Sequence, residues 1–440
     1  MTKNKRIVYI PIEIHAREYT SKLLLSIKLI ESGYEVVFGY KYGVLKNAWK
    51  AKYPGILFNV SAPKDPSKYT KYKEKGFILV AQDEESGALN DEYQTFFESR
   101  IKSDTDSVDA YFCWGQDEYN FFKKIKPFAK NIYLTGSPRT YLWSKSGYTF
   151  YKEEIQKLQN RFGNYVLFVG NFASGNWVFK GSDALANIKN EWIEHHHNLV
   201  KRDNKIIKVF KKAITKLSET KKYNIVIRPH PTEDKTMWEE FANSKLNVSV
   251  VSNGDLTPLI MAAKCVVHNS CTSGIESALC DVPVIALGGD KSDLEQSNQT
   301  ISNKVSIPIY PAQKILDAVN NIDDYWNKKK KNILNTKLHN HGSDNVFHEI
   351  INVFEKFNNL HVPRHKQKNL FELYYIFHDV LVYLKELLYK TGNMSDLGKR
   401  KRILLTKRMI MSDIDKFLQN DYKVSVSRIG NNCFLIRKNN

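Results

Sequence analysis

Residues 223–231 read YNIVIRPHP, so an apolar, strand-like run ends in a polar loop in which two prolines flank His230. Proline restricts its own backbone and that of the residue before it, and Pro229 and Pro231 therefore pre-position this histidine. In α/β proteins, loops at the carboxyl ends of parallel strands are where nucleotides bind. The stretch therefore predicts a parallel sheet with a ligand site at its edge.

A second such loop follows at residues 265–276, which read CVVHNSCTSGIE. The apolar run Cys265–Val267 predicts a strand that neighbours the first one, and the residues after it begin a helix. The hydroxyl groups of Ser270, Thr272 and Ser273, together with the free backbone N–H groups of a helix start, suit an anion. The two loops together predict a site for a phosphate-bearing ligand.

The residues of these loops have predicted roles, each with an alternative. The imidazole of His230 can donate to a phosphate oxygen, and Arg228 adds a permanent charge; the alternative is a histidine held in a turn network. Gly274 lets a ligand approach the backbone closely, and Glu276 can accept hydrogen bonds from ribose hydroxyls. The alternative is a plain helix cap, because Ser273 and Glu276 match the S-x-x-E capping box. Capping and ligand binding are compatible.

The composition limits the class of protein. With 440 residues and 42% hydrophobic content, the chain predicts packed cores, two domains and an extension rather than disorder. The formal net charge of +19 favours an anionic partner such as a nucleotide, an acidic glycan or a membrane surface. The five cysteines are odd in number and form no CxxC motif, which fits reduced thiols in a cytoplasmic protein.

The N-terminal apolar run at 7–12 is cut by Pro11 and Glu13 and is too short for a signal peptide. No stretch approaches the ~20 apolar residues of a membrane-spanning helix. We therefore expect a soluble or peripheral protein.

Apolar strand-like runs alternate with helical periodicity in two successive regions, which predicts an α/β fold with parallel sheets and helices on both faces. In the first region the runs are 7–12, 35–39, 56–58, 77–80, 109–115 and 131–136. In the second they are 165–170, 223–227, 247–251, 265–267 and 283–287. We predict two Rossmann-like domains facing each other across a cleft, the GT-B arrangement. The N-terminal, acceptor-side domain spans 1–150, and the C-terminal, nucleotide-sugar-binding domain spans 163–355, with the linker near 141–163.

Residues 361–440 are predicted to form a basic, partly helical extension, with sixteen Lys and Arg against seven Asp and Glu. Apolar residues recur at helical spacing over 370–388, and basic clusters follow at 399–402 and 407–408. This pattern favours peripheral attachment to an anionic membrane; the alternative is a helix over 365–390 packed on the N-terminal domain. No recognised motif accompanies the charge, so nucleic acid is not an expected partner.

An acidic run, QDEESG at 82–87, follows the strand-like run 77–81 and should lie at the carboxyl end of that strand, facing the cleft. The adjacent carboxylates of Asp83, Glu84 and Glu85 repel one another, which suits a general base or a nucleophile. The alternative is a solvated turn. His15 and Arg17 follow the first strand-like run and are further candidates for the cleft wall.

The tract His195-His196-His197 has the composition of a metal site. Consecutive residues of a helix point about 100° apart, however, and cannot chelate one ion together. We expect a solvated helix face there and no metal.

The order of three elements resembles that of two related enzyme groups. These elements are the acidic run Asp83–Gly87, the pair His230-Pro231 and the Ser/Thr loop with Ser270, Thr272 and Ser273. Over about residues 5–355 the chain is similar to bacterial polysialyltransferases and capsule-type Kdo transferases, which are GT-B enzymes that use CMP-activated sugars. It also resembles the broader group called surface carbohydrate biosynthesis proteins.

The resemblance implies that His230 contacts the CMP phosphate with help from Ser270, Thr272 and Ser273. It implies that one carboxylate of the acidic run is catalytic; we prefer Glu84, with Asp83 close behind it and Glu85 third. Ser86 separates the acidic residues from Gly87, a departure from the pattern that leaves the choice between them open.

The predicted reaction is transfer of a nonulosonic acid, such as a sialic-acid-like sugar or Kdo, from CMP to a growing surface glycan without a metal or cofactor. We expect it at the inner face of the cell membrane, with a glycan or lipid-linked acceptor. One rival is a CDP-polyol phosphotransferase of the teichoic-acid type, which shares the Arg-Pro-His-Pro-like loop but carries a Tyr-Ser-Ser element absent here. The others are a UDP-sugar 2-epimerase, which shares the fold and a Ser-Gly-x-x-Glu loop, and a non-catalytic binding protein.

Overall fold

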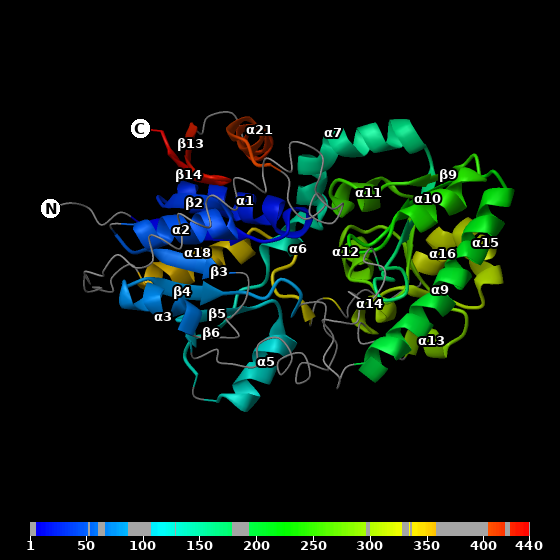
Figure 1. Ribbon diagram of the computed structural model, residues 1–440, viewed down its shortest axis with the longest axis horizontal. Helices are drawn as coiled ribbons and strands as arrows, with labels where there is room; N and C mark the ends of the chain where they lie inside the picture. Colours follow the sequence, from blue (N-terminus) through cyan, green and yellow to red (C-terminus); the bar gives the residue numbers. More distant parts are fainter. Residues whose placement is uncertain are drawn as a thin grey trace. The chain divides into compact units, whose positions relative to one another are not determined.

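The computed structural model describes residues 6–51, 53–59, 67–86, 107–127, 129–177, 193–295, 300–327, 334, 337–357, 404–418 and 423–439. The chain divides into two compact units (Figure 1). Unit 1 comprises Met1–Gly87, Tyr93–Tyr141 and Lys337–Asn440, and unit 2 comprises Ala88–Glu92 and Leu142–Thr336. Unit 1 is therefore assembled from both ends of the chain.

Unit 1 is built on an eight-stranded sheet of order β13-β14-β2-β1-β3-β4-β5-β6. Its strands are β1 (Ile7–Ile12), β2 (Glu35–Tyr40), β3 (Ile56–Asn59), β4 (Ile78–Ala81), β5 (Ala110–Cys113), β6 (Ile132–Leu134), β13 (Val424–Gly430) and β14 (Cys433–Lys438). Strands β1 to β6 are parallel and almost wholly buried, as expected for a sheet covered on both faces. The strand order reverses between β1 and β3, the place where doubly wound sheets bind ligands.

The helices of unit 1 follow the strands in the pattern of a parallel sheet. They are α1 (His15–Glu31), α2 (Lys41–Lys50), α3 (Ser67–Glu74), α5 (Gln116–Ile125), α6 (Pro138–Leu142), α18 (Asn345–Phe357) and α21 (Lys407–Phe417). Helix α18 belongs to the core: the ring of Phe354 lies 6.1 Å from that of Phe58 and 6.0 Å from that of Phe112.

The C-terminal residues return to the edge of this sheet. Strand β14 pairs antiparallel with β2, from Cys433 opposite Gly39 to Ile436 opposite Val36, and β13 pairs with β14. The predicted partly helical extension thus contributes one described helix, α21, and also a β-hairpin to unit 1. The apolar run 370–388 and the basic cluster 399–402 lie outside the described residues, and the membrane attachment inferred from them stays a prediction.

Unit 2 is built on a six-stranded parallel sheet of order β12-β11-β10-β7-β8-β9. Its strands are β7 (Tyr165–Val169), β8 (Asn224–Arg228), β9 (Val248–Val250), β10 (Cys265–His268), β11 (Val284–Leu287) and β12 (Ile307–Ile309). Its helices are α7 (Lys145–Phe162), α9 (Ile193–Glu219), α10 (Thr236–Asn243), α11 (Leu256–Ala262), α12 (Ser273–Leu279), α13 (Ser292–Glu295), α14 (Thr300–Lys304), the 3-10 helix η5 (Ala312–Lys314), α15 (Ile315–Asn320) and α16 (Ile322–Asn327). The order is that of the dinucleotide-binding doubly wound fold, with its reversal between β7 and β10.

These two sheets confirm the predicted α/β class with two parallel-sheet units. One detail was wrong: β8 and β10 are not neighbours, because β7, the first strand of the unit, lies between them. A doubly wound sheet grows outward from its first strand in both directions, so the later strands are separated by it. The predicted cleft and domain limits stay predictions.

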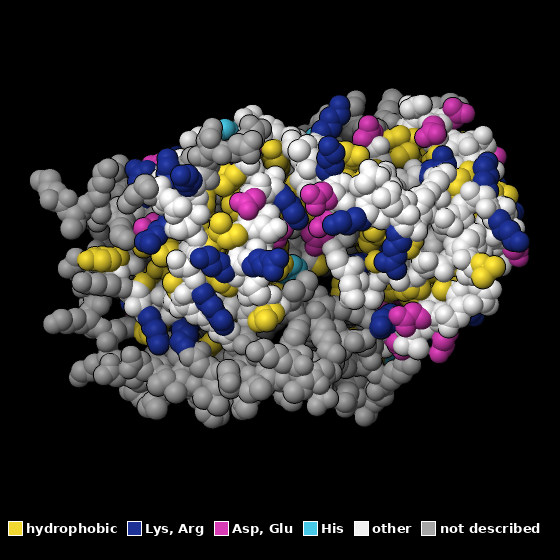
Figure 2. All heavy atoms as spheres, turned by 90° about the horizontal axis from the view of Figure 1, so that it is seen from above, with side chains coloured by type: hydrophobic (Ala, Val, Ile, Leu, Met, Phe, Trp, Pro, Cys, Tyr) yellow, Lys and Arg dark blue, Asp and Glu magenta, His cyan; other side chains and the backbone are white. Residues whose placement is uncertain are grey.

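The described surface carries charged side chains of both signs (Figure 2), and the cysteines are unpaired. No helix among the described residues combines the length and apolar character needed to cross a membrane. On the face shown in Figure 2, Lys and Arg side chains are spread over the described surface with Asp and Glu between them. None of the five cysteines forms a disulfide, and all but Cys280 are buried.

Candidate functional site

Arg228, the last residue of β8, holds a neighbouring loop of unit 2. Its guanidinium donates to the carbonyl oxygens of Val251 at 3.3 Å, Asn253 at 2.5 Å and Gly254 at 2.5 Å. These contacts fix the loop between β9 and α11 and give Arg228 a structural role. Its contact with a phosphate stays a prediction.

His230 is half-buried, and its hydrogen bonds define its tautomer. The backbone N–H of Thr232 donates to Nδ1 at 3.3 Å, and the Thr232 hydroxyl lies 2.7 Å from the same nitrogen. Since a backbone N–H can only donate, Nδ1 is an acceptor, and the proton of the neutral ring is on Nε2. The ring therefore presents Nε2–H as its donor, the group that a phosphate oxygen needs.

Glu233 anchors this loop and was not recognised from the sequence. Its side chain is fully buried, and Oε1 accepts the backbone N–H of His230 at 3.0 Å and of Phe172 at 3.1 Å. Oε2 accepts from Trp238 Nε1 at 2.8 Å. Burial raises the pKa of Glu233, although these donors oppose the effect. The only sequence signal for this role was the position of Glu233 three residues after His230. An acidic residue at that position is also common in ordinary turns.

The loop after β10 is held in a strained conformation. Ser270 has a positive φ of 51°, which is uncommon for a residue with a side chain. Asn303 stabilises it twice, since its Oδ1 accepts the Ser270 N–H at 3.2 Å and its Nδ2 donates to the Ser270 hydroxyl at 2.9 Å. Asn171, in the loop after β7, donates to the Ser270 carbonyl at 3.0 Å.

The β7 loop therefore connects the two loops that the sequence singled out. Asn171 binds the β10 loop, and the next residue, Phe172, donates its N–H to Glu233 in the His-Pro loop. The loop after β7, the strand between β8 and β10, thus links the loops that follow those two strands. The two predicted loops therefore lie at the same sheet edge with the β7 loop between them.

The remaining predicted site residues after β10 are Thr272, Ser273 and Glu276, and each has different surroundings. Thr272 is half-buried at the cap position of α12, and no side-chain bond caps this helix, so the alternative of a capping box at Ser273 and Glu276 is wrong. Ser273 Oγ is buried without a nitrogen or oxygen partner among the described residues, and the Cys271 thiol is its near neighbour. The carboxylate of Glu276 accepts from the Thr257 hydroxyl at 2.5 Å and so binds helix α11, while its ribose contact stays a prediction.

Gly274 is required by a protein contact rather than by a demonstrated ligand. A Cβ atom at this position would lie 2.6 Å from Nε2 of His268. His268 is fully buried, accepts the Cys271 N–H through Nδ1 at 3.2 Å and lies 2.8 Å from the Ser306 hydroxyl. Burial lowers the pKa of His268 to about 3, so the ring is a neutral structural support of the loop.

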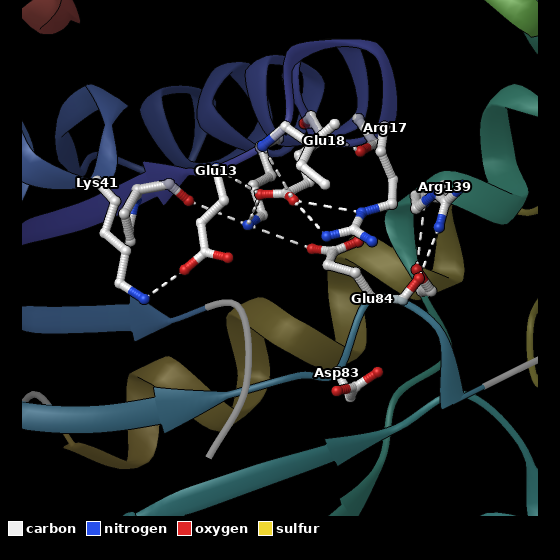
Figure 3. A network of polar contacts seen from close by, with 12 residues as sticks. Glu13, Arg17, Glu18, Lys41, Asp83, Glu84 and Arg139 are labelled. Atoms are coloured by element: carbon white, nitrogen blue, oxygen red, sulfur yellow. Dashed lines mark hydrogen bonds and ion pairs between the residues drawn. The ribbon is translucent and has the colours of Figure 1, made fainter. Parts of the chain in front are cut away.

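In unit 1, the acidic residues after β4 diverge instead of forming one repelling cluster. Asp83 is buried, and its Oδ1 accepts the Glu85 N–H at 2.8 Å. Glu84 is nearly buried and lies 3.2 Å from Lys22 Nζ, whereas Glu85 is paired with Arg17. Figure 3 shows Glu84, Glu18 and Arg17 pointing toward one another, with the Asp83 carboxylate apart from them. The expected mutual repulsion of three adjacent carboxylates was wrong, because each has a different partner.

The backbone of this acidic loop is fixed by two side chains from neighbouring elements. Trp114, which follows β5, donates its indole N–H to the Asp83 carbonyl at 2.6 Å. Arg139, at the start of α6, donates to the Glu84 carbonyl at 2.6 Å and lies 5.7 Å from the centre of the Trp114 ring. Gly87 lies outside the described residues.

The two candidates after β1 have different surroundings. Arg17 takes part in the acidic network, since it pairs with Glu18 at 2.9 Å and with Glu85. His15 is buried instead against the Tyr19 ring, with ring centres 4.4 Å apart, and lies 3.5 Å from the Tyr40 hydroxyl. Burial lowers the pKa of His15 to about 4, so it is neutral at physiological pH.

Glu118, in the first turn of α5, is a second buried carboxyl that the sequence analysis missed. It accepts the Trp114 N–H at 2.7 Å and the Tyr111 hydroxyl at 3.1 Å. Burial raises the pKa of Glu118 to about 7, and the Asp83 charge adds to the increase. An acidic residue in the first turn of a helix is so common that no sequence signal distinguished it.

Metal ligands and cofactors have no assigned place in the structure. Among the residues that the structure describes, no three His, Cys, Asp or Glu side chains are grouped as metal ligands would be. His196 and His197 lie half-buried and exposed on α9, and the side chain of His195 is outside the described part.

The comparisons with known proteins give distant likenesses of fold. No family model matches the chain, and no curated protein matches it. The wall teichoic acid polymerase TagF has 12% identity over 81% of this chain and 90% of its own, with a TM-score of 0.48. The UDP-GlcNAc 2-epimerase from Methanocaldococcus jannaschii has 13% identity over 80% and 99%, with a TM-score of 0.45. The S. aureus MnaA–UDP structure has 13% identity over 80% and 84%, with a TM-score of 0.44.

Proposed function

We propose that the protein is a glycosyltransferase that moves a sugar from a CMP-activated donor to a bacterial surface polysaccharide. The donor sugar in this proposal is a nonulosonic acid, such as a sialic-acid-like sugar or Kdo. The observation that supports it best is His230, whose Nε2–H is set as a donor at the carboxyl edge of a doubly wound sheet, in a loop that the β7 loop links to the Ser/Thr loop. The motif order described above adds the preference for CMP.

The proposed chemistry breaks one bond of the donor and forms one bond to the acceptor. The bond between the anomeric carbon and the phosphate oxygen breaks, and its electron pair goes to the CMP phosphate, which accepts a hydrogen bond from His230. In an inverting reaction the acceptor oxygen bonds to the anomeric carbon, and its proton passes to the Glu84 carboxylate. In a retaining reaction the Glu84 carboxylate first bonds to the anomeric carbon as the CMP phosphate leaves. The acceptor oxygen then displaces the carboxylate, which takes up the proton of the acceptor hydroxyl.

A single phosphate as leaving group suits the side chains that are present. In this proposal the direct contacts to the phosphate come from His230 and the half-buried Thr272 hydroxyl. Arg228 is engaged with three carbonyl oxygens, and the side chains of Ser270 and Ser273 are buried. A CMP-linked sugar leaves with one phosphate group, and in this proposal the donors of His230 and Thr272 stabilise the charge that develops on it.

The proposal is tested by CMP release from CMP-sialic acid and CMP-Kdo. We expect His230→Ala to lower kcat/KM by about 100-fold or more, the usual loss when one donor to a developing oxyanion is removed. His230→Gln, which restores an N–H near the Nε2 position, should recover part of this loss. His197→Ala on the exposed face of α9 is the matched control and should leave turnover unchanged. Equal turnover of wild type and His230→Ala would exclude the phosphate role.

A thermal-shift comparison of nucleotides separates this proposal from its rivals. Ligand binding stabilises the folded state by about 2.7 kcal/mol at a hundredfold excess over Kd. Stabilisation by CMP supports the transferase, whereas a preference for CDP or for UDP supports the polyol phosphotransferase or the epimerase. Stabilisation by none of the three supports the non-catalytic alternative.

A further inference from the structure

Lys22, on the second turn of α1, is a buried ammonium group with three oxygen neighbours. Only 3% of its side chain is exposed. Nζ lies 3.0 Å from the Pro11 carbonyl, 3.3 Å from Glu18 Oε2 and 3.2 Å from Glu84 Oε1. The ammonium group donates hydrogen bonds to the Pro11 carbonyl and to Glu18 and forms an ion pair with Glu84, so three neighbours constrain its position.

Glu18 in turn is fixed to the backbone at the start of α1. Its oxygens accept the Glu13 N–H at 2.8 Å and the Ile14 N–H at 3.3 Å, two donors that the helix start leaves unused. Burial would raise the pKa of Glu18, but Lys22 and Arg17 outweigh it and hold the pKa below its usual value. A rigid path therefore runs from the β1 backbone through Glu18 and Lys22 to Glu84.

We propose that Lys22 is the positioning residue of Glu84: its buried ammonium group, held by Glu18 and Pro11, directs the Glu84 carboxylate. This inference rests on the proposed function, in which Glu84 acts as base or nucleophile. Both roles need a carboxylate in a fixed orientation, and the ion pair with Lys22 supplies that orientation.

The other charges around Glu84 do not replace Lys22. Arg17 forms ion pairs with Glu18 and Glu85 and acts on Glu84 only through its nearby charge. Arg139 reaches the Glu84 carbonyl rather than its carboxylate, and Asp83, the neighbour in the loop, is negative. Removing the Lys22 charge therefore leaves Glu18 and Glu84 buried with too few cations, and a carboxylate in that situation binds a proton more tightly.

The first test compares Lys22→Met with Lys28→Met in the presence of the CMP-sugar. Lys28 lies on the same helix, is partly exposed and pairs only with Glu31 among the ion pairs described for it. We expect Lys22→Met to lower kcat about tenfold or more with an unchanged KM for the donor. The acid limb of its pH–rate profile should move up by about 1–3 pH units, the usual effect of losing a close opposite charge. Lys22→Arg should restore part of kcat, and Lys28→Met should behave as wild type.

A second variant changes the balance in the opposite direction. In Glu18→Gln the ammonium group is no longer shared between two carboxylates, so the acid limb should move to lower pH. If Lys22→Met fails to fold, the double variant Glu18→Gln/Lys22→Met is used instead, because it removes one charge of each sign. Its pH–rate profile is then compared with that of Glu18→Gln.

An NMR titration tests the inference without any donor sugar. The ¹³C signal of the Glu84 carboxyl group, identified by its loss in Glu84→Gln, should change at higher pH in Lys22→Met and at lower pH in Glu18→Gln. Identical titrations in wild type and both variants would overturn the inference. The expected shifts in a protein that does not release CMP would instead retain the inference about Lys22 and remove the transferase.

Discussion

Glu118 and Glu233 are two buried carboxyl groups placed directly behind candidate loops. Each accepts hydrogen bonds from backbone N–H groups. Glu118 accepts from Trp114, and Glu233 accepts from His230 and Phe172. Burial raises the pKa of both. A sequence can indicate residues with chemical character, such as His230, but it contains no measure of burial. The buried groups that hold the candidate residues were therefore the part of the site that could not be predicted.

The raised pKa of Glu118 predicts a pH-dependent stability. The pKa is about 7 in the folded protein against 4.5 for an ordinary glutamate, so folding favours the protonated form. The stability contributed by this group is complete below pH ~4.5 and is lost as the pH rises through about 7. Glu118→Gln carries no charge and should gain about 2–3 kcal/mol relative to wild type between pH 5 and pH 8.

Urea unfolding of both proteins at pH 5, 6, 7 and 8 measures this difference. Glu153→Gln, which replaces an exposed glutamate on α7, is the control and should give a constant difference across the series. If the free-energy difference between Glu118→Gln and wild type is also constant across the pH series, ionisation of Glu118 does not destabilise the folded protein.

At the level of elements, the buried parallel strands were predictable and their neighbours were not. The runs 7–12 and 165–170 correspond to β1 and β7, because strands buried on both faces are continuously apolar. Short strands carry no code for their partners, which is why β7 was not expected between β8 and β10. The hairpin β13–β14 was missed because its alternating, basic sequence gains its burial only by pairing with β2, far away in the chain.

Gly39 in β2 predicts a test of that hairpin. It has a positive φ of 152°, and a Cβ atom there would overlap the Asn432 carbonyl oxygen in the hairpin turn. Gly39→Ala should displace the turn and cost about 2–5 kcal/mol, the sum of backbone strain and overpacking. Hydrogen exchange of residues 424–438 should become faster.

Gly33 is the matched control, because it also has a positive φ, of 85°, but no atom lies within 4 Å of its added Cβ. Gly33→Ala should therefore cost about 1–2 kcal/mol of backbone strain and leave the exchange of the hairpin unchanged. Equal exchange of the hairpin in both variants would mean that Asn432 yields without loss of pairing.

At the level of the whole molecule, the chain leaves unit 1 after Tyr141 and returns to it at Lys337. The residues on either side of this excursion meet again within unit 1: the His339 N–H donates to the Trp114 carbonyl at 2.8 Å, and the rings of Tyr141 and Phe347 lie 5.2 Å apart. Alternating strands and helices along the sequence indicate two sheets, but they do not reveal that the last residues complete the first. That information resides in contacts such as those of Phe354, which are remote in sequence.

This arrangement predicts which pieces of the chain fold alone. Residues 142–336 contain all six strands of the unit 2 sheet and should fold and bind CMP if the proposed function is right. Residues 1–141 lack α18 and β14, so the rings of Phe58 and Phe112 and the edge of β2 are uncovered. We expect this piece to remain unfolded or to aggregate.

Joining residues 1–141 to 337–440 through a glycine-rich linker should restore a folded unit 1, because the contacts of His339 with Trp114 and of Phe347 with Tyr141 hold the two segments together. Near-UV circular dichroism and hydrogen exchange measure the outcome for each piece. A folded 1–141 piece would show that α18 and β14 are not needed for the stability of the sheet. An unfolded joined piece would show that unit 1 needs unit 2, and the division of the chain into separately stable units would then be wrong.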